Sequence, residues 1–372
     1  MRKTFSPAWT VVGLLAGTVA AQVPPTGGGG PPAFNPVGKA YLFPDFKTPT
    51  VTVKYPGNVE ATLDNTYSAI QGYRPLMADV YRVPNAGAKP AIIFIHGGSY
   101  VSGSPRYDRD GLFGEMDGLM AYVASRGYVV IPISYRLAFE AKWPAQLLDV
   151  KAAVRWARAN AATFGIDPQR IGVWGVSAGA HIAAMAGATC NIAEFDSQPP
   201  LAPLPIARTG PVIPASGGPP AGQAKPVESA CVQAAVVWYG ATDFAALDSQ
   251  AEPYTKLVHN GPNSSQSRVL GCSINENCDQ TTMARASAFT YLDKGAIGTA
   301  FLFQAGDRDE AVPWKQSQMM NDALRAKGII SQISIVSGAN HYFQGASKEQ
   351  AKQVLDTFFK FLDENLTNSA VR

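Results

Sequence analysis

Residues 170–188 read RIGVWGVSAGAHIAAMAGA, a segment in which one serine interrupts a long run of apolar and small residues. The run from 171 to 176 is typical of a strand that is buried on both faces of a parallel sheet. The small residues from 178 to 188 favour a helix packed closely on that sheet. Ser177 therefore lies at a tight strand-to-helix turn, where Gly175 and Gly179 permit a strained backbone. This G-x-S-x-G spacing projects the serine hydroxyl at the carboxyl edge of the sheet and predicts a nucleophile.

The alternation of buried strands and helices continues on both sides of this segment. Continuous apolar runs predict strands, and apolar side chains at helical spacing predict amphipathic helices. The predicted strands are 91–98, 128–135, 170–177, 233–240, 299–306 and 329–338, and the predicted helices are 112–125, 144–165, 178–188, 314–327 and 347–363. This alternation favours an α/β fold with a mostly parallel central sheet and helices on both faces.

Two segments interrupt the alternation. Residues 191–230 are dense in Pro and Gly and predict an irregular surface insert, and residues 241–298 predict a polar, loop-rich lid region. Loops at the edge of a sheet often cover a pocket, so we expect both segments to lie over the edge that carries Ser177. Neither segment resembles an independent domain. Residues 47–372 are therefore expected to form one catalytic domain.

The amino-terminal residues have the layout of an export signal. Residues 1–21 place Arg2 and Lys3 before a short apolar stretch and end in small residues, which predicts a cleaved signal peptide. The apolar stretch is shorter than the roughly 20 residues that span a bilayer. Residues 22–46 are rich in Pro and Gly and predict a flexible leader. We therefore expect a secreted or periplasmic protein that has no membrane contact after signal cleavage.

The charge balance argues against nucleic acid as a partner. The chain has a formal net charge of +3, and 16% of its residues are charged. Its lysines and arginines form no cluster of the kind that binds phosphate backbones.

The four cysteines fit an exported chain with disulfide bonds. Three pairings are possible, and we favour Cys190–Cys231 and Cys272–Cys278. We expect no metal site, because the spacing in CSINENC does not suit zinc and no histidine lies near it.

A nucleophilic serine needs a base, and the chain has four histidines. His96 lies upstream in HGGSY, His181 lies on the helix that leads away from the serine, and His259 is expected to be a solvated surface imidazole. His341 follows the last apolar strand, in SGANHYF, at a carboxyl-edge loop. The sequence therefore predicts His341 as the base for Ser177.

An acid is needed to hold the imidazole and to stabilise its positive charge. The segment GDRDEAVPW follows the strand 299–306 and offers Asp307, Asp309 and Glu310. The chain order serine, acid, histidine fits the nucleophile elbow. Spacing alone does not separate Asp307 from Asp309.

Backbone amides near the serine are candidates for oxyanion binding. HGGS follows the strand 91–98, and its glycines allow close backbone approach. We expect donors at Gly98, Ser99 and Ala178, with Gly97 as the alternate. Six aromatic residues near the predicted edge loops are candidates to contact substrate: Tyr100, Trp238, Tyr239, Trp314, Tyr342 and Phe343. Trp238 and Tyr239 also suit the core of a strand.

Taken together, these motifs resemble the α/β-hydrolase superfamily, in particular the branch that holds the hormone-sensitive-lipase relatives and the BD-FAE-like feruloyl/acetyl esterases. The resemblance runs from about residue 50 to 363 and includes AIIFIHGGSYVSG, VVIPISYRLAFEAKWPAQ, IGVWGVSAGAH, FQAGDRDEAVPW and GANHYF. The position of the acid in that family selects Asp309 and leaves Asp307 as a residue that braces the loop. The HGGS motif departs from the HGGG of hormone-sensitive-lipase relatives, and the insert 191–230 is longer than the family suggests.

The resemblance implies carboxylic-ester hydrolysis through an acyl-enzyme, without a cofactor. The expected substrates are short-chain or aromatic esters with acetyl, feruloyl or aryl groups, either small or linked to polysaccharide. Two alternatives are a serine exopeptidase of the same fold and a non-catalytic binding protein. The sequence leaves a monomer and a homodimer open.

Overall fold

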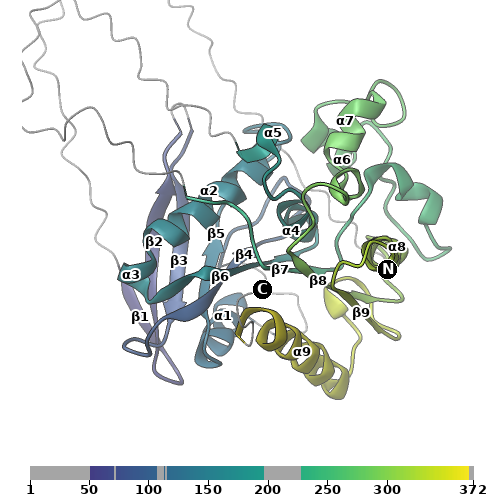
Figure 1. The fold of residues 1–372 in the computed structure, drawn as a ribbon. Helices are drawn as coiled ribbons and strands as arrows, with labels where there is room; N and C mark the ends of the chain where they lie inside the picture. The colour runs from purple at the N-terminus through teal and green to yellow at the C-terminus, as the bar shows by residue number, and fades with distance from the viewer. Residues whose placement is uncertain (1–50, 71–72, 107–112, 114, 197–227, 368–372) are drawn as a thin grey trace, which may run out of the picture. The chain divides into compact units, whose positions relative to one another are not determined.

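The computed structural model describes residues 51–70, 73–106, 113, 115–196 and 228–367 (Figure 1). The predicted signal peptide and leader lie outside the described residues, as does the part of the predicted insert from 197 to 227. The boundary expected near residue 47 therefore stays a prediction.

A nine-stranded sheet organises the described residues. Its strands are β1 (Thr52–Tyr55), β2 (Val59–Ser68), β3 (Leu76–Arg82), β4 (Lys89–Ile95), β5 (Val129–Ile133), β6 (Ile166–Val176), β7 (Ala234–Trp238), β8 (Ala300–Gly306) and β9 (Ser331–Val336). The spatial order is β1-β2-β3-β5-β4-β6-β7-β8-β9, in which the pairs from β5 to β9 are parallel. The predicted α/β class and mostly parallel sheet are confirmed.

The first three strands form an antiparallel edge that the sequence analysis did not assign. β1 pairs with β2, β2 with β3, and β3 with β5, all antiparallel. β1 has no buried residue and β2 mixes buried with half-exposed residues, whereas every residue of β5 and β7 is buried. This difference explains why continuous apolar runs revealed the central strands and not the edge.

Helices cover both faces of the sheet (Figure 1). Helices α1 (Met116–Ser125) and α9 (Lys348–Leu362) pack on one face, where they share a core with β4, β6 and β7. Helices α2 (Ala145–Ala159), α4 (Ala178–Ala188) and α8 (Lys315–Ala326) pack on the other face. Every residue of α4 is buried, which accounts for its small, apolar composition. The predicted helix 144–165 divides into α2 and the short α3 (Ala161–Phe164).

Short elements fill the connection between β7 and β8, over the carboxyl edge of the sheet. They are η1 (Phe244–Ala246), η2 (Asp248–Gln250), α6 (Ser265–Leu270), α7 (Gln280–Arg285) and η3 (Ala288–Tyr291). The remaining short elements are α5 (Ala193–Asp196), η4 (His341–Phe343) and η5 (Asp363–Thr367). The lid region expected at 241–298 therefore has more local helix than its polar composition suggested.

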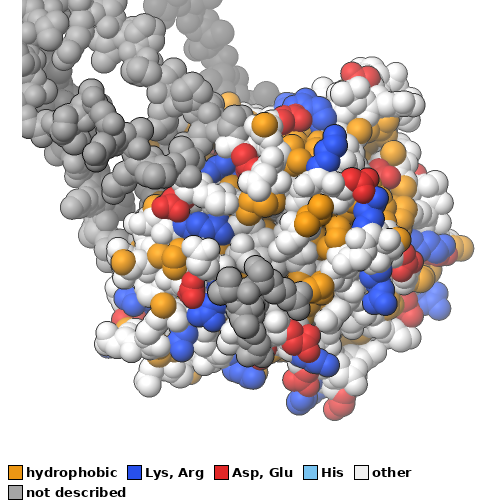
Figure 2. All heavy atoms as spheres, in the orientation of Figure 1, with side chains coloured by type: hydrophobic (Ala, Val, Ile, Leu, Met, Phe, Trp, Pro, Cys, Tyr) orange, Lys and Arg blue, Asp and Glu red, His pale blue; other side chains and the backbone are white. Residues whose placement is uncertain are grey.

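Two disulfides join the pairs of cysteines that the sequence analysis favours. Cys190–Cys231 connects the two ends of the predicted insert, and Cys272–Cys278 closes a loop within the lid region. Cys231 lies just before β7 begins, so the described ends of the insert lie at the edge opposite to Ser177 and not, as expected, over it. None of the described helices has the length and apolar character needed to cross a membrane. On the face drawn in Figure 2, lysines and arginines are interspersed with acidic side chains over the described residues. The expectation that the chain does not bind nucleic acid stays a prediction.

Candidate active site

Ser177 lies at the turn between β6 and α4, in a backbone conformation that few residues with side chains adopt. Its φ is 53° and its ψ is −119°. A Cβ on Gly175 would lie 2.1 Å from the carbonyl oxygen of Gly179, and a Cβ on Gly179 would lie 2.1 Å from that of Ile95. Only glycine fits at either position, so the turn is built as the G-x-S-x-G spacing predicts.

The loops that follow β8 and β9 bring the predicted acid, Asp309, and the predicted base, His341, together with Ser177. Ser177 Oγ and His341 Nε2 are 2.9 Å apart, and His341 Nδ1 lies 2.8 Å from Asp309 Oδ2. The Asp309 side chain is fully buried and that of His341 is 14% exposed. This arrangement can pass a proton from the serine to the imidazole while the acid fixes the ring.

Backbone donors hold the carboxylate of Asp309 in place. Its Oδ1 atom accepts hydrogen bonds from the amides of Ala311 and Val312, both at 2.8 Å. The other oxygen, Oδ2, is therefore left to face His341. All three partners suit a carboxylate that only accepts hydrogen bonds.

Asp307, the other candidate acid, bonds to the neighbouring loop and not to His341. It accepts hydrogen bonds from the amide of Gly338 at 2.6 Å and from the hydroxyl of Ser337 at 3.2 Å. It thereby joins the loop after β8 to the loop that carries His341. The geometry thus places Asp309, and not Asp307, against the base.

Asn340 joins the same two loops and was missed by the sequence analysis. Its Oδ1 atom accepts hydrogen bonds from the amides of His341, at 2.7 Å, and Glu310, at 2.8 Å. An asparagine directly before a predicted base, in ANH, was the available signal, because asparagine side chains often bond to nearby backbone.

The HGGS loop lies directly against the serine. A Cβ on Gly97 would be 3.2 Å from Ser177 Cβ, and the loop turns with a φ of 100° at Gly98 and 55° at Ser99. Within the described ranges, the amides of Gly98, Ser99 and Ala178 donate to no protein acceptor. These three amides therefore stay the predicted donors of an oxyanion hole.

The side chains of Tyr135 and His96 support this loop. The hydroxyl of Tyr135 donates to the carbonyl oxygen of His96 at 3.1 Å, and the two rings stack with centroids 4.3 Å apart. Burial lowers the pKa of His96 to about 4, so the neutral ring can donate from Nδ1 to the carbonyl oxygen of Gly97 at 2.7 Å. In a trans peptide the C=O and N–H point in opposite directions. Fixing the Gly97 carbonyl therefore directs the Gly98 amide the other way.

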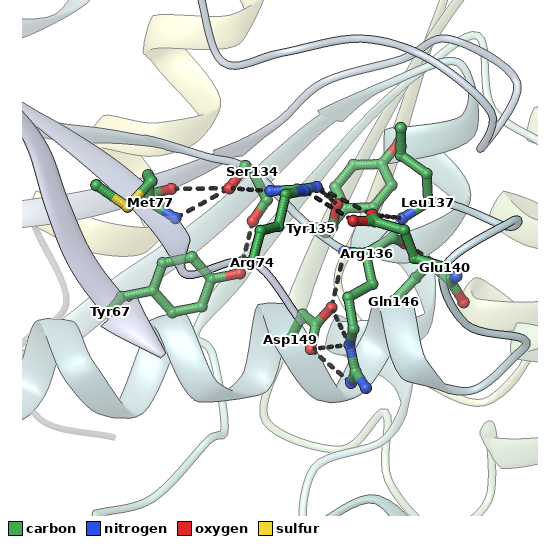
Figure 3. A network of polar contacts seen from close by, with 10 residues as sticks. All are labelled: Tyr67, Arg74, Met77, Ser134, Tyr135, Arg136, Leu137, Glu140, Gln146 and Asp149. Carbon is green, nitrogen blue, oxygen red and sulfur yellow. Dashed lines mark hydrogen bonds and ion pairs between the residues drawn. The ribbon is translucent and has the colours of Figure 1, made fainter. Parts of the chain in front are cut away.

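The network drawn in Figure 3 holds Tyr135 in turn. Arg74 donates to the carbonyl oxygen of Tyr135 at 2.8 Å and pairs with Glu140 at 2.8 Å. Arg136 forms a partly buried ion pair with Asp149 of α2, also shown in Figure 3, at 2.7 Å. The connection from β5 to α2 is thus anchored to the sheet and to a helix.

Removing the Tyr135 hydroxyl should impair this support. We expect Tyr135→Phe to lower kcat about tenfold with little change in KM, because a misaimed oxyanion donor costs transition-state stabilisation and leaves substrate binding intact. Steady-state kinetics on a p-nitrophenyl ester measures both constants. A variant that keeps wild-type kcat would show that the loop does not depend on this hydroxyl.

A cavity of about 170 Å³ opens beside Ser177 and His341. Its other lining residues are Ser99, Tyr100, Ala178, Ala241, Leu257, His259, Ser265, Gln266, Ala311, Val312 and Tyr342. Five of these come from the predicted lid region, which agrees with its expected place over this edge. A larger hollow of about 510 Å³ lies at the opposite edge, where β4, β5 and β6 begin.

Two of the six aromatic residues predicted as candidates to contact substrate, Tyr100 and Tyr342, line this cavity. The other four, Trp238, Tyr239, Trp314 and Phe343, are not among its lining residues. Trp238 is 1% exposed, and its indole donates to Gln304 Oε1 at 2.7 Å within the core. Trp314 packs against the hydrophobic core on the side of α9.

His259 was predicted to be a solvated surface side chain, and that prediction is wrong. Its side chain is 2% exposed and lines the cavity. The polar stretch NGPNSSQSR that follows it in the sequence suggested solvent, but its partners, Asp248 and Ala311, come from other segments of the chain.

Comparison with known proteins places this site in a family. The BD-FAE family model matches residues 78–324, which is more than half of the chain. Esterase LipQ of Mycobacterium tuberculosis is 26% identical over 78% of this chain and 60% of its own length. Esterase LipC of the same organism is 38% identical over 33% of this chain and 30% of its own length. The chain thus spans between about a third and three fifths of these curated relatives.

Solved structures share the fold. A truncated carbohydrate esterase from gut microbiota is 24% identical, with a TM-score of 0.62 over 83% of this chain and 99% of that chain. The propionate-bound esterase Est2 of Thermogutta terrifontis is 21% identical, with a TM-score of 0.57 over 85% of this chain and 97% of that chain. From the family match, the sheet topology and the shared fold, we conclude that this chain belongs to the BD-FAE family and has the α/β-hydrolase fold.

Proposed function

We propose that this protein is an exported serine carboxylesterase in which Ser177 is the nucleophile, His341 the base and Asp309 the acid. The observation that carries the proposal is the continuous contact from Ser177 Oγ to His341, at 2.9 Å, and from His341 to Asp309, at 2.8 Å. The esterase names of the curated relatives support it further.

In the first half of the reaction, Ser177 Oγ attacks the ester carbonyl carbon while its proton passes to His341 Nε2. The carbonyl oxygen gains negative charge and accepts hydrogen bonds from the amides of Gly98, Ser99 and Ala178. The C–O bond to the alcohol then breaks, and His341 returns the proton to the leaving alkoxide. The acyl group remains on Ser177.

In the second half, His341 removes a proton from water, and the hydroxide formed attacks the acyl carbon. The bond to Ser177 Oγ breaks, and the serine regains a proton from His341. The products are an acid, an alcohol and unchanged enzyme. Asp309 remains a carboxylate throughout, since its task is to orient the ring and stabilise its charge.

The small cavity supports short acyl groups as the preferred substrates. Its 170 Å³ are enclosed mainly by Tyr100, Leu257, Val312 and Tyr342, together with the polar His259 and Gln266. Est2 of Thermogutta terrifontis has been solved with propionate and with butyrate. We therefore propose acetyl to butyryl esters as the main class, with aryl or feruloyl esters and polysaccharide-linked acetyl groups as further candidates.

A panel of substrates tests this proposal. We expect purified protein to hydrolyse p-nitrophenyl acetate and butyrate faster than the octanoate, with methyl ferulate as the aromatic probe. Aminoacyl p-nitroanilides test the exopeptidase alternative in the same assay. Turnover of the anilides alone would favour the exopeptidase. No turnover of any ester by folded protein would overturn the esterase proposal and favour a binding protein.

A further inference from the structure

A second histidine–aspartate pair lies in the wall of the same cavity. His259 Nδ1 is 2.8 Å from Asp248 Oδ1, and its Nε2 is 2.7 Å from the carbonyl oxygen of Ala311. The pair comes from the lid region, whereas Ala311 belongs to the loop that holds Asp309. His259 thus connects two segments that are otherwise separate in the chain.

Both ring nitrogens of His259 face atoms that can only accept hydrogen bonds. Asp248 offers a carboxylate oxygen and Ala311 a carbonyl oxygen. A neutral imidazole carries one N–H, so one of the two contacts would set a lone pair against a lone pair. Both hydrogen bonds can form together only when His259 carries a proton on each nitrogen.

The contact to Ala311 leads directly to the acid. The carbonyl of Ala311 and the amide of Val312 belong to one peptide group, and that amide donates to Asp309 Oδ1 at 2.8 Å. A charged donor on the carbonyl polarises the peptide and strengthens the hydrogen bond made by its N–H. An unbroken chain of contacts therefore runs from Asp248 through His259 and this peptide to Asp309.

We infer that His259 is a positioning residue: held as an imidazolium by Asp248, it orients and polarises the Ala311–Val312 peptide that fixes the catalytic acid. This inference rests on the proposed function of Ser177, His341 and Asp309. It also gives the lid region a second task besides covering the cavity, because the lid supplies both members of the pair.

The charged groups around His259 are consistent with this role. Burial raises the pKa of Asp248, but hydrogen bonds from the His259 amide and ring and from the Asn260 amide outweigh it, so its pKa is lowered. Asp248 is therefore a carboxylate near neutral pH. Among the other charged side chains of these loops, Lys256 pairs with Glu310 and Glu252 pairs with Lys315, each at 2.6 Å. His341 lines the same cavity and is bonded to Asp309.

Two substitutions separate the contacts of His259. In His259→Gln the amide nitrogen can occupy the place of Nε2 and still donate to Ala311, whereas in His259→Asn the shorter amide can reach only Asp248. We expect His259→Asn to lower kcat about tenfold with KM within about twofold, and His259→Gln to recover part of that loss, because the glutamine restores the donor to Ala311 without the positive charge. This order would show that the donor to Ala311, and not the contact with Asp248, carries the effect on kcat. Equal kcat in both variants, or wild-type kcat in His259→Asn, would overturn the inference.

Two further measurements test the inference independently of these two variants. Asp248→Asn should lower kcat as His259→Asn does, whereas Asp243→Asn, which removes a charge and can keep the cap of η1 through its Oδ1 atom, should not. The ¹⁵N spectrum of labelled protein at pH 7 should show two N–H groups on His259, assigned by their loss in His259→Gln. A ring with a single N–H would overturn the inference even if the enzyme is active. Failure of the proposed function would instead appear as wild-type protein without esterase activity.

Discussion

Ser177→Ala is expected to lower kcat for p-nitrophenyl butyrate by at least about 10⁴-fold, with KM nearly unchanged. The reason is that the substitution removes the only atom that attacks the ester, while the cavity and the oxyanion donors remain. Alanine also fits the space of the serine, so the fold should tolerate it. Discontinuous assays at high enzyme concentration can measure the residual rate.

A matched substitution at another serine controls for general damage. Ser249 lies in η2, and its hydroxyl donates to the carbonyl oxygen of Ala246 away from the cavity lining. Ser249→Ala should retain wild-type kcat. Retention of activity in Ser177→Ala would mean that another group performs the attack.

Asp309→Asn has the second-largest expected effect, a loss of kcat on the order of 10⁴-fold. The amides of Ala311 and Val312 donate to Oδ1, so the asparagine must turn its oxygen toward them and its NH₂ toward His341. His341 Nδ1 then accepts a hydrogen bond, which places the ring proton on Nε2. In that tautomer Nε2 cannot take the proton of Ser177. Steady-state kinetics, with circular dichroism to verify folding, measures this loss.

Asp307→Asn provides the comparison two residues away. Asp307 accepts hydrogen bonds from Ser337 and Gly338 and does not contact His341. Its amide variant should keep kcat within about tenfold of wild type, because only loop support is weakened. A larger loss in Asp307→Asn than in Asp309→Asn would reverse the assignment of the acid.

The sequence predicted the central fold and the residues of the candidate triad for a physical reason. Central parallel strands are buried on both faces, so they appear as continuous apolar runs, and G-x-S-x-G marks a turn that admits only glycine. Ser177 and His341 could be identified from these local signals. Asp309 needed the family resemblance, because Asp307 has the same chemistry and nearly the same position.

The rest depended on contacts between residues far apart in the chain. At the antiparallel edge, β1 has no buried residue and β2 is half buried, so neither strand contains a continuous apolar run. His259 is followed by a polar stretch of sequence, but η2 and the loop after β8 enclose it. Trp238 is the last residue of β7, at the carboxyl edge of the sheet, but Trp174 and Phe343 pack against it. Contacts of this kind between separate segments produce no pattern that can be read from the local sequence.

Covalent trapping of the nucleophile tests the central claim most directly. A fluorophosphonate that mimics the tetrahedral intermediate should react once per chain, and peptide mass mapping should locate the adduct on Ser177. Loss of esterase activity should follow the labelled fraction, and Ser177→Ala should not be labelled. Full inactivation with the adduct on another residue, or continued hydrolysis by protein that is fully labelled at Ser177, would contradict the account.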